Sequence, residues 1–231
     1  SGTEMVHRIP EHGGGGEFQL GDQLVVRESQ AAVVFRDGQA LDVFRAGRHT
    51  LATQNLPLLG GLIRMPFGTT PFKVDIFFVN MRTFLDQKWG TAEPISLRDS
   101  ELGMVRLRAF GTFSMAIADA QMFVNVIVGQ RGLYDTPDIE QFLRSLIVSK
   151  MTDVLATSMG GKSFFDLQAK FNELSAGIKA TVKDDFAAVG LDMKAMYIQS
   201  ISPTEETAKA IDERASMGAI GNMQAYLQFK S

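Results

Sequence analysis

The sequence has no cysteine, only three histidines and a single tryptophan among its 231 residues. Without cysteine the chain can form no disulfide, offer no thiolate to a metal and use no thiol nucleophile. It also lacks the basic excess that nucleic-acid-binding proteins normally carry, because its net charge is −3. We therefore expect no nucleic-acid partner. The absence of cysteine also fits a reducing compartment, and the scaffold hypothesis below places the protein in the cytoplasm.

Long hydrophobic runs are also missing, since no apolar stretch approaches the roughly 18 residues that a membrane-spanning helix needs. The nearest candidate, residues 113–128, is interrupted by Asp119, Gln121 and Asn125. No signal peptide is visible. Ser1 and Gly2 are typical of the residues that tag cleavage leaves behind, and residues 1–20 are expected to be a flexible segment. The chain is expected to be soluble.

The first half of the chain carries β signals. Ala31–Phe35 and Ala40–Phe44 flank an Asp37-Gly38 pair, which predicts a tight hairpin. Residues 73–80 predict a further strand, with residues 83–89 as its suggested partner. Residues 104–117 give the clearest strand. Its apolar residues share one face, Arg106, Arg108, Thr112 and Ser114 lie on the other, and Gly111 marks a bulge or a close backbone approach.

The second half becomes helical. Thr136-Pro137-Asp138 signals a helix start, and Ser163 opens a second helix that ends near Gly190. A strand over residues 191–201 follows, and Ser202-Pro203-Thr204-Glu205 predicts a capping box that opens a helix through about residue 217. The order of elements indicates an α+β fold: a β-rich N-terminal half followed by helices with one returning strand.

Motifs that could carry chemistry are weak. The glycine run at residues 13–16 resembles an esterase oxyanion loop but lacks a nucleophile elbow, so a flexible loop is favoured. Gly160-Gly161-Lys162-Ser163 resembles the end of a P-loop but follows a helix, so an ordinary helix–helix turn is favoured. The histidines are too scattered for a metal site, and His49 is interpreted as structural. We expect no catalytic residues, metal, cofactor or small-molecule substrate.

Two features remain open between a structural and a functional interpretation. Arg106 and Arg108 could hold an anion, although pairing with nearby acids is the simpler reading. The segment of residues 55–68 gathers large apolar side chains among prolines and glycines that oppose a regular helix. It is either a loop folded over the core or an exposed membrane or partner surface. Its candidate surface residues are Leu56, Leu58, Leu59, Leu62, Ile63 and Phe67.

Taken in order, these features resemble the SPFH or band 7 superfamily, the stomatin–prohibitin–flotillin group. The resemblance covers roughly residues 21–227. It rests on the glycine-turn-strand of residues 38–50, the long strand closed by Asp119, the helix around residues 143–147 and the helix–Gly–strand–Ser-Pro–helix unit of residues 186–214. The phrases at residues 26–30, 88–91, 103–112 and 214–218 resemble a bacterial virion-core-protein-like branch.

The resemblance implies an SPFH domain over residues 21–202 and a C-terminal helix over residues 203–231 that begins an oligomerisation region. It implies a non-catalytic scaffold that self-assembles, associates peripherally with membrane and organises or recruits partner proteins. The expected oligomer contacts on the helix are Ala208, Ile211, Ala215 and Met217. The alternative is a soluble adaptor that binds a protein through the β half without touching lipid. An enzyme is the least favoured class, because no site can be assembled from the sequence.

Overall fold

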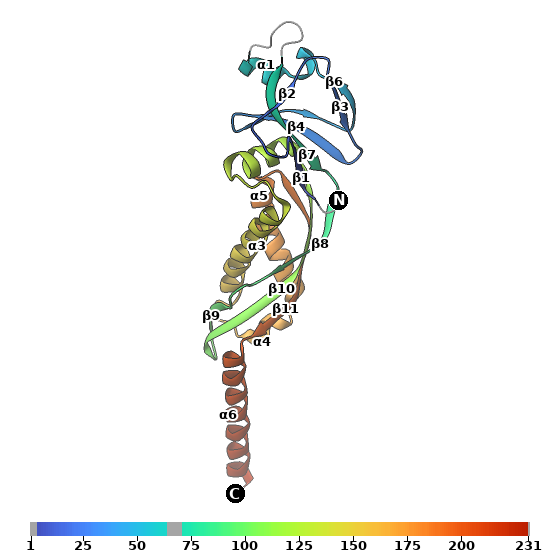
Figure 1. The fold of residues 1–231 in the computed structure, drawn as a ribbon. Helices are drawn as coiled ribbons and strands as arrows, with labels where there is room; N and C mark the ends of the chain where they lie inside the picture. Colours follow the sequence, from blue (N-terminus) through green and yellow to red (C-terminus); the bar gives the residue numbers. More distant parts are fainter. Residues whose placement is uncertain (1–3, 64–70, 231) are drawn as a thin grey trace. The chain divides into compact units, whose positions relative to one another are not determined.

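A computed structural model describes residues 4–63 and 71–230 of the chain, shown in Figure 1. Its contacts divide the chain into two compact units. The first unit comprises residues 1–86, 114–143 and 182–195, and the second comprises residues 87–113, 144–181 and 196–231. Each unit is described by itself below.

The first unit is built on an antiparallel sheet in the order β1-β7-β4-β5. The strands are β1 (Val6–Ile9), β7 (Phe72–Asn80), β4 (Gln30–Arg36) and β5 (Gln39–Phe44), and β2 (Gly16–Phe18) also pairs with β7. A separate two-stranded ribbon joins β3 (Gln23–Val26) to β6 (Gly47–Thr50). The α1 helix (Pro57–Ile63) follows a short 3₁₀ turn at Thr53–Asn55.

The predicted hairpin is confirmed as β4 and β5. Asp37 and Gly38 at its tip have φ values of 51° and 77°, the two positive angles that a tight primed turn requires. The prediction of a flexible segment up to residue 20 is wrong for β1 and β2. Both strands pair with β7, and the Met5 N–H donates a hydrogen bond to the Thr136 hydroxyl at 2.9 Å.

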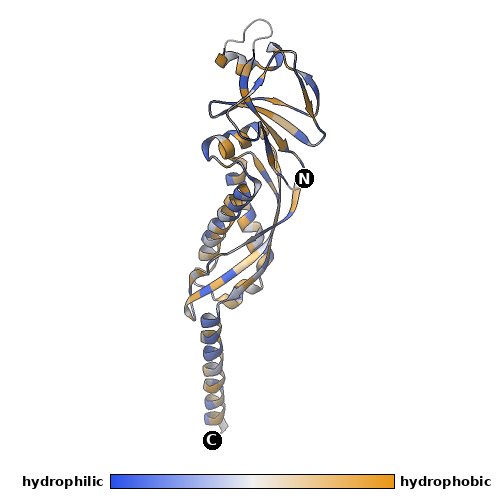
Figure 2. Ribbon diagram, viewed as in Figure 1, coloured by the Kyte–Doolittle hydropathy of each residue, from blue (hydrophilic) through white to orange (hydrophobic). Residues whose placement is uncertain are grey.

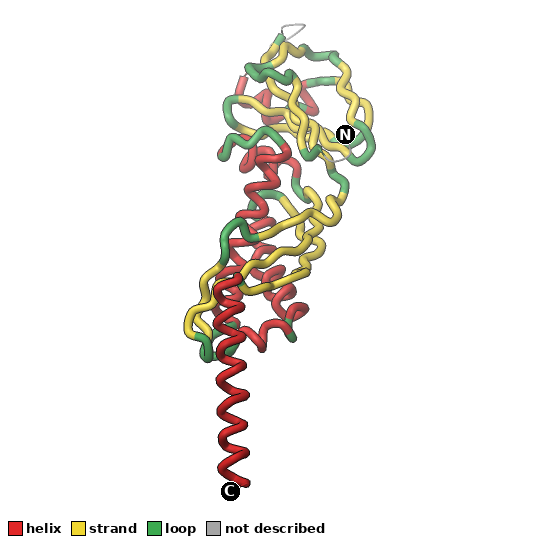
Figure 3. The backbone as a smooth tube through the Cα atoms, turned by 60° about the horizontal axis from the view of Figure 1, so that its bottom comes forward, coloured by secondary structure: helices red, strands yellow, loops and turns green. Residues whose placement is uncertain are grey.

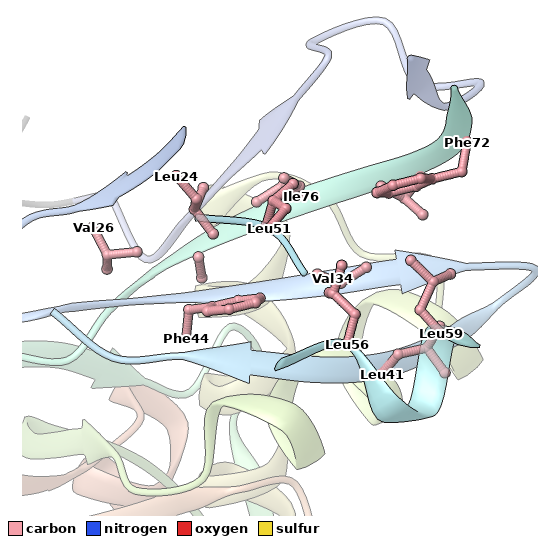
Figure 4. Close-up of a cluster of buried hydrophobic side chains, with 12 residues drawn as sticks. Leu24, Val26, Val34, Leu41, Phe44, Leu51, Leu56, Leu59, Phe72 and Ile76 are labelled. Atoms are coloured by element: carbon pink, nitrogen blue, oxygen red, sulfur yellow. The ribbon is translucent and has the colours of Figure 1, made fainter. Parts of the chain in front are cut away.

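The core of the first unit lies between the β4, β5 and β7 strands, the β3–β6 ribbon and α1 (Figure 4). Leu24 and Val26 enter it from the ribbon. Leu59 enters it from α1, and Leu56 enters it from the position just before that helix. The β3, β4 and β7 strands contribute alternate residues, because successive side chains point to opposite faces of a sheet, whereas β5 contributes Leu41 and Phe44.

A second antiparallel sheet runs in the order β11-β10-β8, and β9 also pairs with β10. Its strands are β8 (Thr83–Gly90), β9 (Ile95–Asp99), β10 (Gly103–Ile117) and β11 (Leu191–Pro203). Residues 73–80 and 83–89 are strands as predicted, but they do not pair with one another. The β8 strand pairs with β10 instead of β7.

The long strand β10 has the predicted alternation, which is visible as bands in Figure 2. Val105, Leu107 and Ala109 are buried, whereas Arg106 and Arg108 are exposed. Ser114 differs from the prediction, because it is buried and its Oγ accepts a hydrogen bond from the Asp86 N–H at 3.3 Å.

Gly111 is a point of close backbone approach, as its place in the pattern suggested. A Cβ atom there would lie 1.9 Å from the Tyr197 carbonyl oxygen and 2.9 Å from the Trp89 ring. No other residue type could occupy this position without moving β10 or β11.

Apart from α1, the described helices follow residue 119, and Figure 3 draws helices in red and strands in yellow. They are α2 (Ala120–Phe123), the π-helix Val124–Gln130, α3 (Thr136–Ser158), α4 (Phe164–Gln168), α5 (Phe171–Ala187) and α6 (Glu205–Lys230). The predicted start at Thr136 is confirmed. Gly190 has a φ of 79° after α5, as expected of a residue that ends a helix. The α+β class is therefore confirmed.

Two helix boundaries differ from the predictions. The helix opened by Ser163 is two helices, α4 and α5, with a break at residues 169–170. The capping box at Ser202 is wrong, because β11 continues to Pro203 and α6 begins at Glu205. The Thr204 N–H and carbonyl bond instead to the Arg106 carbonyl and the Ala208 N–H, at 2.9 and 2.8 Å.

Candidate functional surfaces

Metal-ligating side chains do not gather into a candidate centre in the part of the chain that the structure describes. No group of three or more metal-ligating side chains forms among residues 4–63 and 71–230. His49 Nε2 lies 2.7 Å from the Arg45 carbonyl oxygen, and the His49 ring packs on Phe44. These contacts fit the interpretation of His49 as a structural residue.

The two glycine-rich motifs have structural roles. Gly161 has a φ of 77°, and Ser163 caps α4 through a capping box with Asp166. This is the predicted helix–helix turn. The glycine run lies between β1 and β2, with positive φ at Gly13, Gly14 and Gly15. The Gly15 N–H donates to Asp75 Oδ1 at 3.2 Å, which ties the run to β7.

A buried carboxylate organises backbone amides in the second unit. Asp99 is 3% exposed, and its oxygens accept hydrogen bonds from the N–H groups of Glu101, Leu102 and Phe164 at 2.8, 2.9 and 2.6 Å. The Phe164 N–H belongs to the first turn of α4, where amides lack partners within the helix. Asp99 therefore fixes the β9–β10 turn and the start of α4, with both of its oxygens accepting backbone hydrogen bonds.

The apolar segment at residues 55–68 contains a helix, contrary to the prediction that its prolines and glycines oppose one. The reason is a buried carboxylate from β5. Asp42 accepts hydrogen bonds from the N–H groups of Leu58 and Leu59 at 3.0 and 2.9 Å. Pro57 occupies the first helical position, where a missing N–H costs nothing.

The α1 leucines divide into a buried and an exposed set. Leu56 and Leu59 are 0% exposed, so both are core residues and the prediction of a surface role is wrong for them. Leu58 and Leu62 are about half exposed, at 49% and 51%, and Ile63 is partly buried against the core. Phe67 lies outside the described residues. Leu58 and Leu62 are four residues apart, which places them on one face of the helix.

The α6 helix has 26 residues and is exposed along most of its length. Ala208 and Ile211 are half-buried, whereas Ala215 and Met217 are exposed. Met217 lies roughly 160° around the helix from Ala215 at 100° per residue. The four predicted contact residues therefore do not share one face.

A second set of side chains gathers on the Met217 side of α6. We call this set the apolar α6 face. It consists of large residues at helical spacing, each more than half exposed: Met217, Ile220, Met223 and Leu227. Four exposed large hydrophobic residues on one face of a helix are unusual for a solvated surface.

A cavity of about 560 Å³ lies in the first unit beside β1 and β3. Its wall combines apolar side chains, among them Val25 and Phe78, with charges of both signs such as Glu28 and Arg82. Among the described strands, β1 pairs with β7 alone and β3 with β6 alone. The cavity therefore lies next to two unpaired strand edges.

No described helix is both long enough and apolar enough to cross a membrane.

Comparison with known proteins gives two findings. A family model described as "SPFH domain-Band 7 family" matches residues 6–219. The "Uncharacterized protein YdjI" of Bacillus subtilis (strain 168) is 26% identical to the chain over 215 residues, which cover 92% of the chain. The matched region spans 66% of that protein, slightly less than two thirds of its length.

Proposed function

Because the chain belongs to the SPFH domain–band 7 family, we propose that it is a non-catalytic scaffold that self-assembles and associates peripherally with membrane in the cytoplasm. Its task would be to organise or recruit partner proteins. Family membership itself suggests the scaffold-like role. Self-assembly, membrane contact and partner recruitment are the parts that the surfaces of this chain support and that experiments must test.

The observation that carries the proposal is the exposed α6 helix with its apolar α6 face. Packing this face against a second copy would remove large apolar surfaces from water, at roughly 25 cal/mol per Å². The face begins at Met217, and its spacing of three and four residues suits helix pairing. Ala208 and Ile211, half-buried near the start of α6, contribute less to such a contact.

Membrane contact is assigned to the exposed side of α1. Leu58 and Leu62 present apolar surface there, and Asp42 holds the start of the helix that carries them. Two leucines bind a bilayer weakly. Self-assembly compensates, because many weak sites on one assembly act at a high effective concentration.

We also propose which branch of the family the chain belongs to. The phrases at residues 26–30, 88–91, 103–112 and 214–218 support the bacterial virion-core-protein-like branch.

Membrane contact through α1 is tested by replacing its two exposed leucines. Leu58→Ser/Leu62→Ser removes the exposed pair and leaves the core intact, so it should reduce binding to vesicles without lowering stability. Val25→Ser/Val43→Ser is a matched control, because it removes two exposed apolar side chains elsewhere in the same unit. Equal vesicle binding by the α1 variant and the wild type would show that α1 does not contact the membrane.

The cavity beside β1 and β3 favours a second candidate, the soluble adaptor. An extended segment of another protein could pair with the unpaired edge of either strand and place a side chain near Phe78. Phe78→Arg would then weaken capture of a soluble partner while vesicle binding stays unchanged. If the wild-type chain neither self-assembles nor binds membrane, and a soluble partner is captured in this way, the adaptor is the better description.

A further inference from the structure

The exposed face of the second unit's sheet carries an uneven distribution of charge. Lys88 on β8, Arg98 on β9, and Arg106 and Arg108 on β10 are all exposed. The strand segments of this unit, residues 87–90, 95–99, 103–113 and 196–203, contain one acid, Asp99, and it is buried on the opposite face. A chain with a net charge of −3 thus holds four cations on one sheet face.

These cations have little neutralisation within the described part of the chain. Arg106 lies 3.9 Å from Glu206 of α6, and both side chains are largely exposed, so the pair contributes little. Arg108 and Arg98 form no ion pair with any described residue. Glu93 and Glu101 lie in the turns on either side of β9 rather than on the strands.

Large apolar side chains lie among the cations. Met104 and Phe110 flank Arg106 and Arg108 along the exposed side of β10 and are 63% and 53% exposed. The register places Met104 opposite Arg98 on β9. Gly90 of β8 lies against Phe110 and adds no side chain that would cover it. Tyr197 on β11 is also more than half exposed.

The packing of β10 explains why Met104 and Phe110 stay exposed. Val105, Leu107 and Ala109 occupy the buried side of β10, so the strand has no further apolar face to hide. An exposed sheet face normally carries polar residues in alternation with the buried ones. Here methionine and aromatic residues replace some of them, which indicates a surface that becomes covered.

We propose that this basic face, defined by Lys88, Arg98, Arg106, Arg108, Met104 and Phe110, binds the surface of a membrane that contains anionic phospholipids. Guanidinium groups match phosphate oxygens in pairs of hydrogen bonds. Each cation near an anionic surface contributes about 1 kcal/mol. Phe110 and Met104 enter the boundary between headgroups and acyl chains, where amphipathic and apolar side chains are stable.

A membrane fits this face better than a nucleic acid. Single strands are bound in basic grooves with a series of aromatic residues. A cavity in this unit lies away from the basic face, among residues such as Val154 on α3, Lys162 in the turn before α4 and Leu174 on α5. Phe110, with Tyr197 on the neighbouring β11, is a small aromatic set compared with such a series, and a lipid surface requires no groove. The inference rests on the proposed membrane association and gives it a lipid class.

The first test compares charge variants for binding to phosphatidylcholine vesicles with and without phosphatidylglycerol, at low ionic strength. Arg98→Gln/Arg106→Gln/Arg108→Gln should bind the anionic vesicles on the order of a hundredfold more weakly than the wild type. Arg48→Gln/Lys183→Gln/Arg214→Gln removes the same charge from exposed positions outside the basic face. It should stay within about threefold of the wild type, because distant charges are screened.

Three outcomes would overturn the inference. The first is equal binding of the wild type to neutral and anionic vesicles, and the second is an equal loss in both triple variants. The third is a loss of self-association or of single-stranded DNA binding in the first variant with vesicle binding unchanged. The Leu58→Ser/Leu62→Ser variant separates this inference from the membrane proposal. If anionic vesicles bind the triple arginine variant as they bind the wild type, but do not bind Leu58→Ser/Leu62→Ser, the membrane proposal stands and the basic face is wrong.

The second test follows the depth of one side chain. In a Trp89→Phe background, Phe110→Trp should be quenched by brominated lipid, whereas Phe165→Trp should not. Phe165 is a close control, because it is 51% exposed and lies in the same unit on α4. Equal quenching of the two tryptophans, or none at Phe110→Trp, would contradict insertion of this face.

Discussion

At the scale of single residues, buried aspartates hold the backbone where regular hydrogen bonding ends. Asp42 accepts two amides at the start of α1, and Asp99 accepts three amides around the β9–β10 turn and α4. The bonds of Asp99 to Glu101 and Leu102 are local, but the two helix caps are not visible from local sequence, since Asp42 is 16 residues from Leu58 and Asp99 is 65 residues from Phe164. A cap that is distant in sequence has no local signature.

Asp42→Ala leaves the N–H groups of Leu58 and Leu59 without acceptors inside the protein. We expect the free energy of unfolding to fall by about 2 kcal/mol, measured by urea denaturation. Asp42→Asn should cost less, because its side-chain oxygen can still accept one of the two bonds. A loss below about 0.5 kcal/mol for the alanine variant would contradict the capping role, because substitutions at ordinary surface positions change stability by that much.

Gly111→Ala should be severely destabilising, because its Cβ would lie 1.9 Å from the Tyr197 carbonyl oxygen. A loss of more than about 3 kcal/mol, or failure to fold, is expected for such overpacking against backbone. The fluorescence of Trp89, the single tryptophan, reports unfolding directly. Gly218→Ala on α6 is the control, because its Cβ meets nothing within 4 Å, and it should stabilise the helix by up to about 1 kcal/mol. Similar stability of the two variants would refute the close approach.

At the scale of elements, the sequence predicts local structure well and long-range partners poorly. The Asp37-Gly38 hairpin, the alternation of β10 and the cap at Gly190 depend on neighbouring residues, and all three are confirmed. The sequence does not predict the partner of β8, because a half-buried strand can pair with any compatible edge. It does not predict the end of β11 either, because Ser202-Pro203 also suits a strand end. The tertiary hydrogen bond of Thr204 to Arg106 decides where α6 begins.

The apolar α6 face makes a prediction about pairing between copies. Ile220→Asp/Met223→Asp should keep the chain monomeric at concentrations where the wild type associates, because burying two carboxylates in an apolar contact is costly. Asn222→Asp/Ala225→Asp adds charge on another side of the same helix. It should leave association nearly unchanged when measured by sedimentation. Equal effects of both pairs would mean that charge, rather than the face, controls assembly.

At the scale of the whole molecule, each unit offers its own surface. The first unit presents Leu58 and Leu62 on α1, and the second presents the basic face and α6. The candidate surfaces were only partly predictable. The sequence pattern located the apolar segment, but only the fold separates its buried leucines from its exposed ones. The basic face needed the pairing of β8, β9 and β10, which brings together residues 88, 98, 106 and 108.

Assembly and membrane binding should reinforce one another in the intact chain. Each copy binds weakly, so an assembly of several copies should bind vesicles far more tightly than a single copy does. Ile220→Asp/Met223→Asp should therefore weaken vesicle binding as well as association, although it changes no proposed lipid contact. Unchanged vesicle binding by a monomeric variant would contradict this coupling.

The most direct measurement is the solution mass of the chain as a function of concentration, with and without anionic vesicles. The scaffold account predicts that the mass rises above 25.3 kDa in multiples of the chain as concentration increases. It also predicts that the chain sediments with the vesicles and that its association is promoted there. A chain that stays at 25.3 kDa and remains free of the vesicles at every concentration would contradict the account.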